Sequence, residues 1–256
     1  MHGRFLLTHA SERADIPEQA QVDAFLPRYE PRQVLDPAEP VSIGAMVGPE
    51  AFTEVRYLAH ERMRQALEVI PAVRTGFAAG FGRDSGGLVR PYRTEDAETV
   101  VVALGSVLGT LKDAVDELRA DGMKIGVLGI TTFRPFPADA VRLALGTRTR
   151  QVVVLERALA PGSGGIVTGD IRAALAAWDL RISSVVAGLG GRAVTRKSLI
   201  AMAARAAAGE LKPLTFLDLN TGLVEAEVAR MSAARRSGPS AENILRDLGI
   251  TASRIG

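Results

Sequence analysis

Residues 92–137 read YRTEDAETVVVALGSVLGTLKDAVDELRADGMKIGVLGITTFRPFP, and this stretch decides the fold of the chain. Its apolar, β-branched run at residues 99–104 shows no alternation, which is typical of a strand buried on both faces. After a Gly-Ser turn, apolar residues recur at helical spacing from Val107 to Leu118. A second apolar run at residues 124–130 completes a strand–helix–strand unit, whose two strands we expect to lie parallel and side by side.

The same alternation of strand and helix patterns continues through the middle of the chain. Apolar runs at residues 151–156 and 182–187 predict two further buried strands. The helices predicted between and after them cover residues 137–145, 166–177 and 196–208. The sequence therefore predicts an α/β fold, with three α/β/α layers around a mostly parallel sheet.

Composition excludes several classes of function. The 256 residues carry a formal net charge of +2 and no massed basic block, so we expect no nucleic-acid partner. No apolar run reaches the ~18 residues of a membrane span, and we expect a cytoplasmic protein without a membrane partner. The absence of cysteine excludes disulfides, thiolate metal ligands and iron–sulfur ligation within these residues.

The pattern along the chain predicts four regions. They are an extended arm or interdomain linker at residues 1–47, a long helix and loop at 48–88, the α/β domain at 89–209 and a helical tail at 210–256. The proline-rich arm is too long for an ordinary loop, so we expect it to pack on another domain or subunit. Within the helix expected at residues 49–79, Pro71 predicts a kink or a break.

Three glycine-rich turns follow predicted strands, and in a parallel sheet all three lie at the edge where ligands commonly bind. Their spacing matches neither the dinucleotide fingerprint nor the phosphate loop. Two interpretations remain open: a binding edge for a small molecule or a partner's loop, or tight turns in which Gly109 allows close packing of helix and sheet. The candidate residues in these turns are Gly105, Ser106, Gly109, Thr110, Gly162, Gly164, Gly165 and Gly190.

Charged side chains also come to this edge. Arg134, Arg157 and Arg192 each follow a predicted strand, and an arginine cluster suits a carboxylate or a phosphate. The favoured alternative is that each arginine fixes its own loop by binding backbone carbonyls or nearby acids. For Glu156, at the end of a buried strand, a capping or loop-fixing acceptor is favoured over a site carboxylate.

No catalytic or metal-binding residue is predicted. The three histidines, His2, His9 and His60, lack metal-ligand spacing with acids or with each other. Ser106 lacks the Gly-x-Ser-x-Gly setting and no histidine follows residue 60, which disfavours a serine triad and an independent hydrolase. The residues alone predict a binding or docking domain of a larger enzyme.

An ordered set of motifs resembles the α subunit of the pyruvate:ferredoxin oxidoreductase (pyruvate synthase) family. The downstream motifs are YRTEDA at 92–97, ALGSVLGT at 103–110, FRPFP at 133–137, VLER at 154–157, APGSGG at 160–165 and GLGGR at 188–192. Upstream, residues 22–27, 35–37, 44–49 and 52–57 resemble the interdomain stretch of that family. Each motif is weak alone, but their order and spacing over roughly residues 4–230 are specific.

The resemblance implies a transketolase C-terminal-like domain that serves as the structural or docking part of an α subunit. It implies that the assembled enzyme uses thiamine diphosphate, CoA and iron–sulfur clusters to convert pyruvate and CoA into acetyl-CoA and CO2. Electrons would pass to ferredoxin. The implied partners are a separately encoded pyrimidine-binding chain and β, γ and iron–sulfur δ subunits. We expect no cofactor on this chain alone and no catalysis by it in isolation.

The chain departs from the family pattern at three positions. The family usually has Asp-Arg where this chain has Glu156 and Arg157, and usually has Asp where Ala193 follows the GLGGR motif. Pro71 lies in a helix that is ordinarily free of proline. These departures leave the 2-oxoacid open. The alternative hypothesis is a non-catalytic binding or interaction module that holds an anionic ligand, such as CoA or a nucleotide, at its glycine-rich edge.

Overall fold

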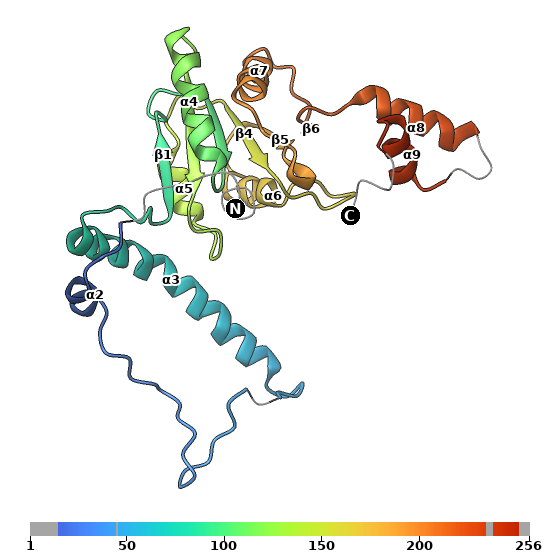
Figure 1. The fold of residues 1–256 in the computed structure, drawn as a ribbon. Helices are drawn as coiled ribbons and strands as arrows, with labels where there is room; N and C mark the ends of the chain where they lie inside the picture. Colours follow the sequence, from blue (N-terminus) through green and yellow to red (C-terminus); the bar gives the residue numbers. More distant parts are fainter. Residues whose placement is uncertain (1–14, 45, 234–237, 251–256) are drawn as a thin grey trace. The chain divides into compact units, whose positions relative to one another are not determined.

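The computed structural model describes residues 15–44, 46–233 and 238–250 of the chain (Figure 1). The chain divides into two compact units, residues 1–215 and residues 216–256. The division into two units does not test the four regions predicted from the sequence, which stay a prediction.

The first unit is built on a mixed sheet with the strand order β1-β3-β2-β4-β5-β6. The strands are β1 (Val89–Tyr92), β2 (Thr99–Ala103), β3 (Ile125–Ile130), β4 (Gln151–Glu156), β5 (Arg181–Val186) and β6 (Leu214–Phe216). β3, β2, β4 and β5 pair in parallel, whereas β1 runs antiparallel to β3 at the edge of the sheet. The mostly parallel sheet predicted from the sequence is confirmed.

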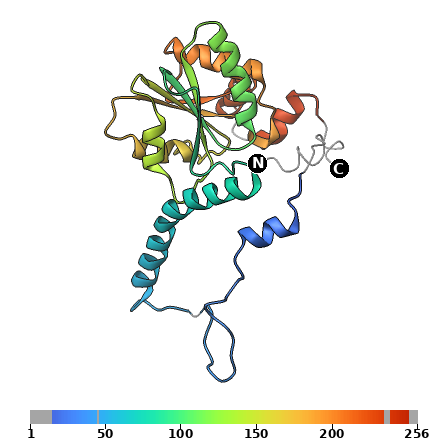
Figure 2. The same cartoon turned by 90° about the vertical axis from the view of Figure 1, so that its left-hand side faces the viewer.

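Helices cover both faces of this sheet (Figure 2). α4 (Val107–Ala120) packs against α7 (Arg196–Ala207), and α5 (Ala138–Ala144) packs against α6 (Ile166–Ala174). The predicted unit at residues 99–130 is present as β2, α4 and β3, with β2 and β3 side by side. The three-layer α/β/α class is therefore confirmed.

The core lies on both sides of the sheet because the side chains of successive strand residues point to opposite faces. Val100, Val102, Val152 and Val154 belong to the cluster that packs against α5 and α6. The intervening valines of the same strands are buried as well, with exposed fractions of 1% or less. This burial on two faces explains why β2 and β4 read as continuous apolar runs.

The strand order creates a switch point between β2 and β4. These two strands are neighbours, yet the chain leaves β2 into α4 and leaves β4 into α6, and the two helices cover opposite faces. The loops that follow the two strands therefore diverge at the carboxyl edge of the sheet. In open α/β sheets such a divergence leaves a crevice.

The arm contains a helix that the sequence did not predict, α2 (Gln19–Phe25). The expectation of extended chain was wrong here because Glu18 and Gln21 form a capping box, in which each side chain binds the other's backbone N–H. The α2 residue Phe25 packs edge-on against Phe77 and Phe81. Residues 1–14 of the predicted arm lie outside the described residues.

α3 (Phe52–Phe81) is a single helix of 30 residues that continues through Pro71. The predicted break is absent, and Figure 2 shows the helix axis bending partway along its length. No residue of α3 is buried. The helix ends at Gly82, which adopts the left-handed conformation with φ = 63°.

The second unit contains α8 (Thr221–Ala233) and α9 (Ser240–Asp247), which pack against each other. Glu227 of α8 is only 5% exposed and accepts hydrogen bonds from Arg230 and Asn243. Arg230 also binds Asp247 at 2.8 Å. The side-chain bonds from Asn243, Ser240 and Arg230 hold the pKa of Glu227 below its usual value.

Candidate functional site

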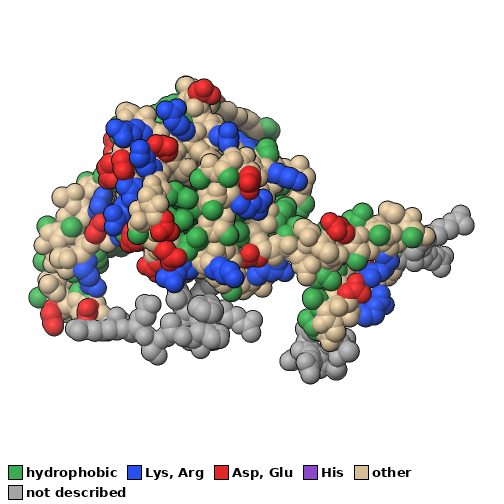
Figure 3. Space-filling view, turned by 90° about the horizontal axis from the view of Figure 1, so that it is seen from above, with side chains coloured by type: hydrophobic (Ala, Val, Ile, Leu, Met, Phe, Trp, Pro, Cys, Tyr) green, Lys and Arg blue, Asp and Glu red, His purple; other side chains and the backbone are tan. Residues whose placement is uncertain are grey.

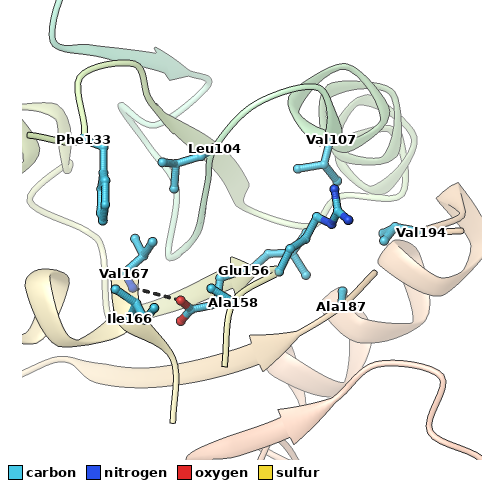
Figure 4. A pocket seen from close by; sticks show the side chains of 11 residues that line it. Leu104, Val107, Phe133, Glu156, Ala158, Ile166, Val167, Ala187 and Val194 are labelled. Carbon is cyan, nitrogen blue, oxygen red and sulfur yellow. Dashed lines mark hydrogen bonds between the residues drawn. The ribbon is translucent and has the colours of Figure 1, made fainter. Parts of the chain in front are cut away.

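The crevice at the switch point is a pocket of about 440 Å³ (Figure 4). Leu104 and Val107 line it from the turn after β2, and Phe133 lines it from the segment after β3. Ile166 and Val167 contribute from the start of α6. The predicted ligand edge of the sheet therefore carries a cavity, and its walls are mostly aliphatic and aromatic.

Glu156 is the buried carboxylate of this pocket, at the last position of β4. It is 4% exposed and accepts the backbone N–H of Val167 at 2.9 Å through Oε2. Its Oε1 accepts the backbone N–H and the hydroxyl of Thr168, and the hydroxyl of Ser184. The carboxylate thus caps the first turn of α6, where a negative charge is favoured. This agrees with the capping interpretation of Glu156.

Gly165 leaves room for this carboxylate. A Cβ at residue 165 would lie 1.7 Å from Oε1 of Glu156 and 2.6 Å from the Ser184 hydroxyl oxygen. The backbone of Gly165 is extended, with φ = −75°, so the glycine is required by space and not by its dihedral angle. Among the glycines that the sequence singled out, Gly165 is therefore one that lets another side chain lie close to its backbone.

Other glycines at this edge of the sheet are favoured for a different reason, which is their backbone conformation. Gly105, Gly162, Gly164 and Gly190 adopt positive φ, between 63° and 110°, which side-chain-bearing residues rarely adopt. Gly109 has no non-local heavy atom within 4 Å of an added Cβ. The alternative in which Gly109 permits close packing of helix and sheet is therefore wrong, because α4 is not packed tightly at that position.

The remaining two edge candidates are polar residues at the start of α4. Ser106 stands at the N-cap of α4 without a side-chain capping bond, and Thr110 is half-buried one turn later. Neither residue lines the pocket.

The three predicted arginines differ in their relation to the pocket, and one of them lines it. Arg157 lines it and donates from Nε and Nη2 to the carbonyl oxygen of Gly188, at 3.3 and 3.1 Å. Arg134 stacks over the ring of Phe133 at 4.0 Å and binds Asp170 at 3.0 Å. Arg134 and Arg192 are not among the lining residues. The contacts of Arg157 and Arg134 agree with the loop-fixing alternative; a binding role for the three arginines stays a prediction.

Sequence reasoning missed the apolar walls and the hydroxyl donors of this site. Thr168 and Ser184 are 12 and 28 residues away from Glu156 along the chain, so no local motif joins them. One signal was available, because Ser183 and Ser184 are polar residues inside an otherwise apolar predicted strand. Buried hydroxyls need a partner, and Glu156 supplies one for Ser184.

The described residues offer no metal site, and charges of both signs are mixed on the face seen in Figure 3. No group of three or more His, Asp or Glu side chains in residues 15–44, 46–233 and 238–250 could hold a metal ion. Figure 3 shows Lys and Arg side chains intermixed with Asp and Glu over the face in view. No helix in this part of the chain combines the length and the apolar content needed to cross a membrane.

The pocket lies within the part of the chain that matches a known protein family. Residues 97–199 match the family model of pyruvate:ferredoxin oxidoreductase core domain II. This range includes β2 to β5 and all the residues that line the pocket.

The relatives are oxidoreductase subunits. The chain is 40% identical over 191 residues to pyruvate synthase subunit PorA of Methanothermobacter thermautotrophicus, which covers 75% of this chain and 49% of that protein. It is 34% identical over 202 residues to ketoisovalerate oxidoreductase subunit VorA of Pyrococcus horikoshii, covering 78% and 51%. The chain thus spans about half the length of the relatives it matches.

Among solved structures, the chain is similar to a 2-oxoglutarate:ferredoxin oxidoreductase from Magnetococcus marinus. The TM-score is 0.35 and the sequence identity is 17%, over 54% of this chain and 23% of that one.

Proposed function

We propose that the chain is a component of a 2-oxoacid:ferredoxin oxidoreductase, because residues 97–199 match the family model of pyruvate:ferredoxin oxidoreductase core domain II and the relatives are oxidoreductase subunits. In this proposal the α/β unit is the structural or docking domain of an α subunit. The observation that carries the proposal is the 40% identity to a PorA subunit over 75% of the chain.

The assembled enzyme would convert pyruvate, CoA and two oxidised ferredoxins into acetyl-CoA, CO2, a proton and two reduced ferredoxins. We favour pyruvate over a branched 2-oxoacid as the substrate of the assembled enzyme. The reason is that the chain is 40% identical to the PorA subunit and 34% identical to the VorA subunit. Other subunits would complete the complex: a pyrimidine-binding chain, β, γ and an iron–sulfur δ subunit.

The described residues that line the pocket do not fit thiamine diphosphate, and the sequence does not fit an iron–sulfur cluster. A thiamine diphosphate site needs oxygen ligands for the magnesium that accompanies the diphosphate. The pocket offers one carboxylate, Glu156, which already accepts four hydrogen bonds. Iron–sulfur clusters need thiolates, and the 256 residues contain none. We therefore assign the cofactors to the partner subunits and derive no catalytic step on this chain.

Reconstitution tests the proposal. The chain would be co-expressed with candidate pyrimidine-binding, β, γ and iron–sulfur polypeptides, and the complex purified through a tag on this chain. The expected result is co-purification at physiological salt, together with reduction of ferredoxin that depends on pyruvate, CoA and thiamine diphosphate. The preparation that omits this chain is the control and should lose most of the activity.

Two results would contradict the proposal. One is a chain that stays alone through purification with every candidate partner present. The other is pyruvate decarboxylation by the purified chain with only thiamine diphosphate added, because a domain that docks and supports should not turn over substrate by itself.

A further inference from the structure

We propose that the pocket at the β2–β4 switch point binds a small, uncharged, apolar molecule that carries one N–H or O–H donor. This inference does not depend on the proposed function, because it rests on the walls, the floor and the charges of the pocket alone.

The walls set the apolar part of the ligand. Val107, Phe133 and Ile166 line the cavity from three different loops and helices, and Figure 4 shows their side chains around one common space. Ile166 is 46% exposed although it begins a helix that packs on the core. A volume of about 440 Å³ suits a ligand with one or two rings or a short branched chain. Burial of its apolar surface would provide the binding free energy.

The floor sets the polar part. Figure 4 shows the Glu156 carboxylate beside Ile166 and Val167 at the base of the cavity. A carboxylate offers about four acceptor positions, two on each oxygen. Oε1 receives three hydrogen bonds, whereas Oε2 receives only the N–H of Val167 from the described residues. One acceptor position of Oε2 is left for a donor on the ligand.

The charges favour a neutral ligand. An anion would be placed against the buried carboxylate of Glu156, which repels it. A cation would meet the guanidinium of Arg157 and the positive end of α6, which repel it in turn. A neutral donor gains the hydrogen bond to Oε2 without either repulsion and without losing the hydration of a full charge.

This ligand class differs from the anionic ligand considered for the glycine-rich edge. Arg157 is the only cation that lines the pocket among the described residues, and its guanidinium already donates to Gly188. CoA or a nucleotide would bring several negative charges to a cavity whose floor is itself negative.

A set of four similar probes tests the inference on the full chain. They are 2-phenylethanol, its methyl ether, 2-phenylethylammonium and phenylacetate, titrated at neutral pH while methyl NMR signals of Val107, Ile166 and Val167 are followed. We expect 2-phenylethanol to bind about tenfold more tightly than the ether, because the ether cannot donate to Oε2. We expect the two ions to bind at least as weakly as the ether.

A pair of variants locates the binding. Ala158 lines the pocket and is exposed, so Ala158→Phe should fill the cavity without disturbing the core and should abolish the titration of 2-phenylethanol. The matched control is Ala207→Phe, an exposed position on α7 outside the lining, which should leave the affinity unchanged.

Several results would overturn the inference. Tighter binding of phenylacetate would make the pocket an anion site. If the ether and the alcohol bound with equal affinity, a hydrogen bond to Glu156 would not contribute to ligand recognition. Absence of shifts with every probe at millimolar concentration, or unchanged binding by A158F, would show that the pocket is not the site.

Discussion

The interaction between Glu156 and Gly165 is the contact on which the candidate site depends. The carboxylate reaches α6 only because residue 165 has no side chain, and it then receives donors from α6 and from β5. The glycine leaves the space that the glutamate side chain needs.

Gly165→Ala should destabilise the protein by about 1–3 kcal/mol, because the new methyl group overlaps Oε1 of Glu156 and must displace it. Equilibrium urea unfolding, followed by circular dichroism, measures the change. The matched control is Gly169→Ala in the same helix, where no heavy atom lies within 4 Å of the added Cβ. That variant should be neutral or more stable by up to about 1 kcal/mol. Equal losses in the two variants would contradict the role given to Gly165.

At this scale the sequence predicted the role of Glu156 but not its partners. A carboxylate at the end of a buried strand, followed by a glycine turn and a helix, is placed to cap that helix. Ser184 comes from the next strand, and its proximity depends on the parallel register in which Glu156 pairs with Val186. That register is a property of the folded sheet and cannot be read from a local pattern.

At the scale of elements, the junction between α3 and β1 is fixed by an ion pair. Arg74 donates from Nε and Nη2 to the two carboxylate oxygens of Asp84, at 2.7 and 2.9 Å. The N–H of Gly86 donates to the same carboxylate at 2.8 Å. The side-chain bond from Arg74, supported by the bond from Gly86, lowers the pKa of Asp84 to about 2.

Because this pKa is depressed in the folded chain, the ion pair should stabilise the junction above about pH 4 and lose its effect as the pH falls toward 2. A carboxyl ¹³C NMR titration should give a midpoint near 2 for Asp84. In Arg74→Met the midpoint should rise toward the ordinary value of 3.8. High salt should shift it in the same direction, because both side chains are about half exposed. An unchanged titration midpoint in this variant would show that Arg74 does not lower the pKa of Asp84.

α3 itself is the element that most needs a partner. It is a 30-residue helix with no buried residue, and it exposes Tyr57 and Leu58, each at 62%. Helices in water owe most of their stability to packing of an apolar face, which the described residues do not supply along most of α3.

If α3 docks within the proposed complex, Leu58→Asp should prevent co-purification of the partner subunits. It should change the unfolding free energy of the isolated chain by no more than about 0.5 kcal/mol, because Leu58 is exposed there. Size-exclusion chromatography of the co-expressed subunits measures the assembly. Gln65→Asp, also exposed on α3, is the control and should assemble normally. Normal assembly of L58D would place the interface elsewhere.

Elements with strong periodicity were predictable, and short ones were not. β2, α4 and β3 follow from an uninterrupted apolar run and a helical repeat that tertiary packing reinforces. β1 was missed because its four residues contain Pro91 and alternate only partly in burial. α2 was missed because prolines surround it, and its stability comes from a capping box and from Phe77 and Phe81, more than 50 residues away.

At the scale of the whole molecule, the two units should be separable. The buried apolar residues of the α/β unit lie between Ala97 and Leu211, while the second unit is organised around Glu227, Arg230 and Asn243. The side chains of the two cores therefore come from separate stretches of chain.

A chain truncated after Asp218 should keep the thermal unfolding transition of the α/β unit within a few degrees, because β6 and every buried residue of the sheet core remain. Truncation after Ala208 is the comparison. It removes Leu211, which is 7% exposed, and β6, so its transition should fall clearly. Calorimetry measures both chains, and loss of the transition in the longer one would show that the units depend on each other.

The pocket also belongs to this scale. The sequence predicted the edge of the sheet, because glycine turns follow its strands, but the cavity depends on β2 lying beside β4. That adjacency places α4 and α6 on opposite faces, and nothing within either strand encodes it.

The antiparallel strand β1 has a consequence for how other polypeptides can attach. It closes one side of the sheet with only four residues, and Pro91 lacks the amide that a further strand would need. Growth of the sheet by addition of a foreign strand is blocked there, which guards against fibre-like self-association. A protein that binds at this edge of the sheet must contact side chains, such as those of Arg90 and Tyr92. It cannot extend the sheet through backbone hydrogen bonds to β1.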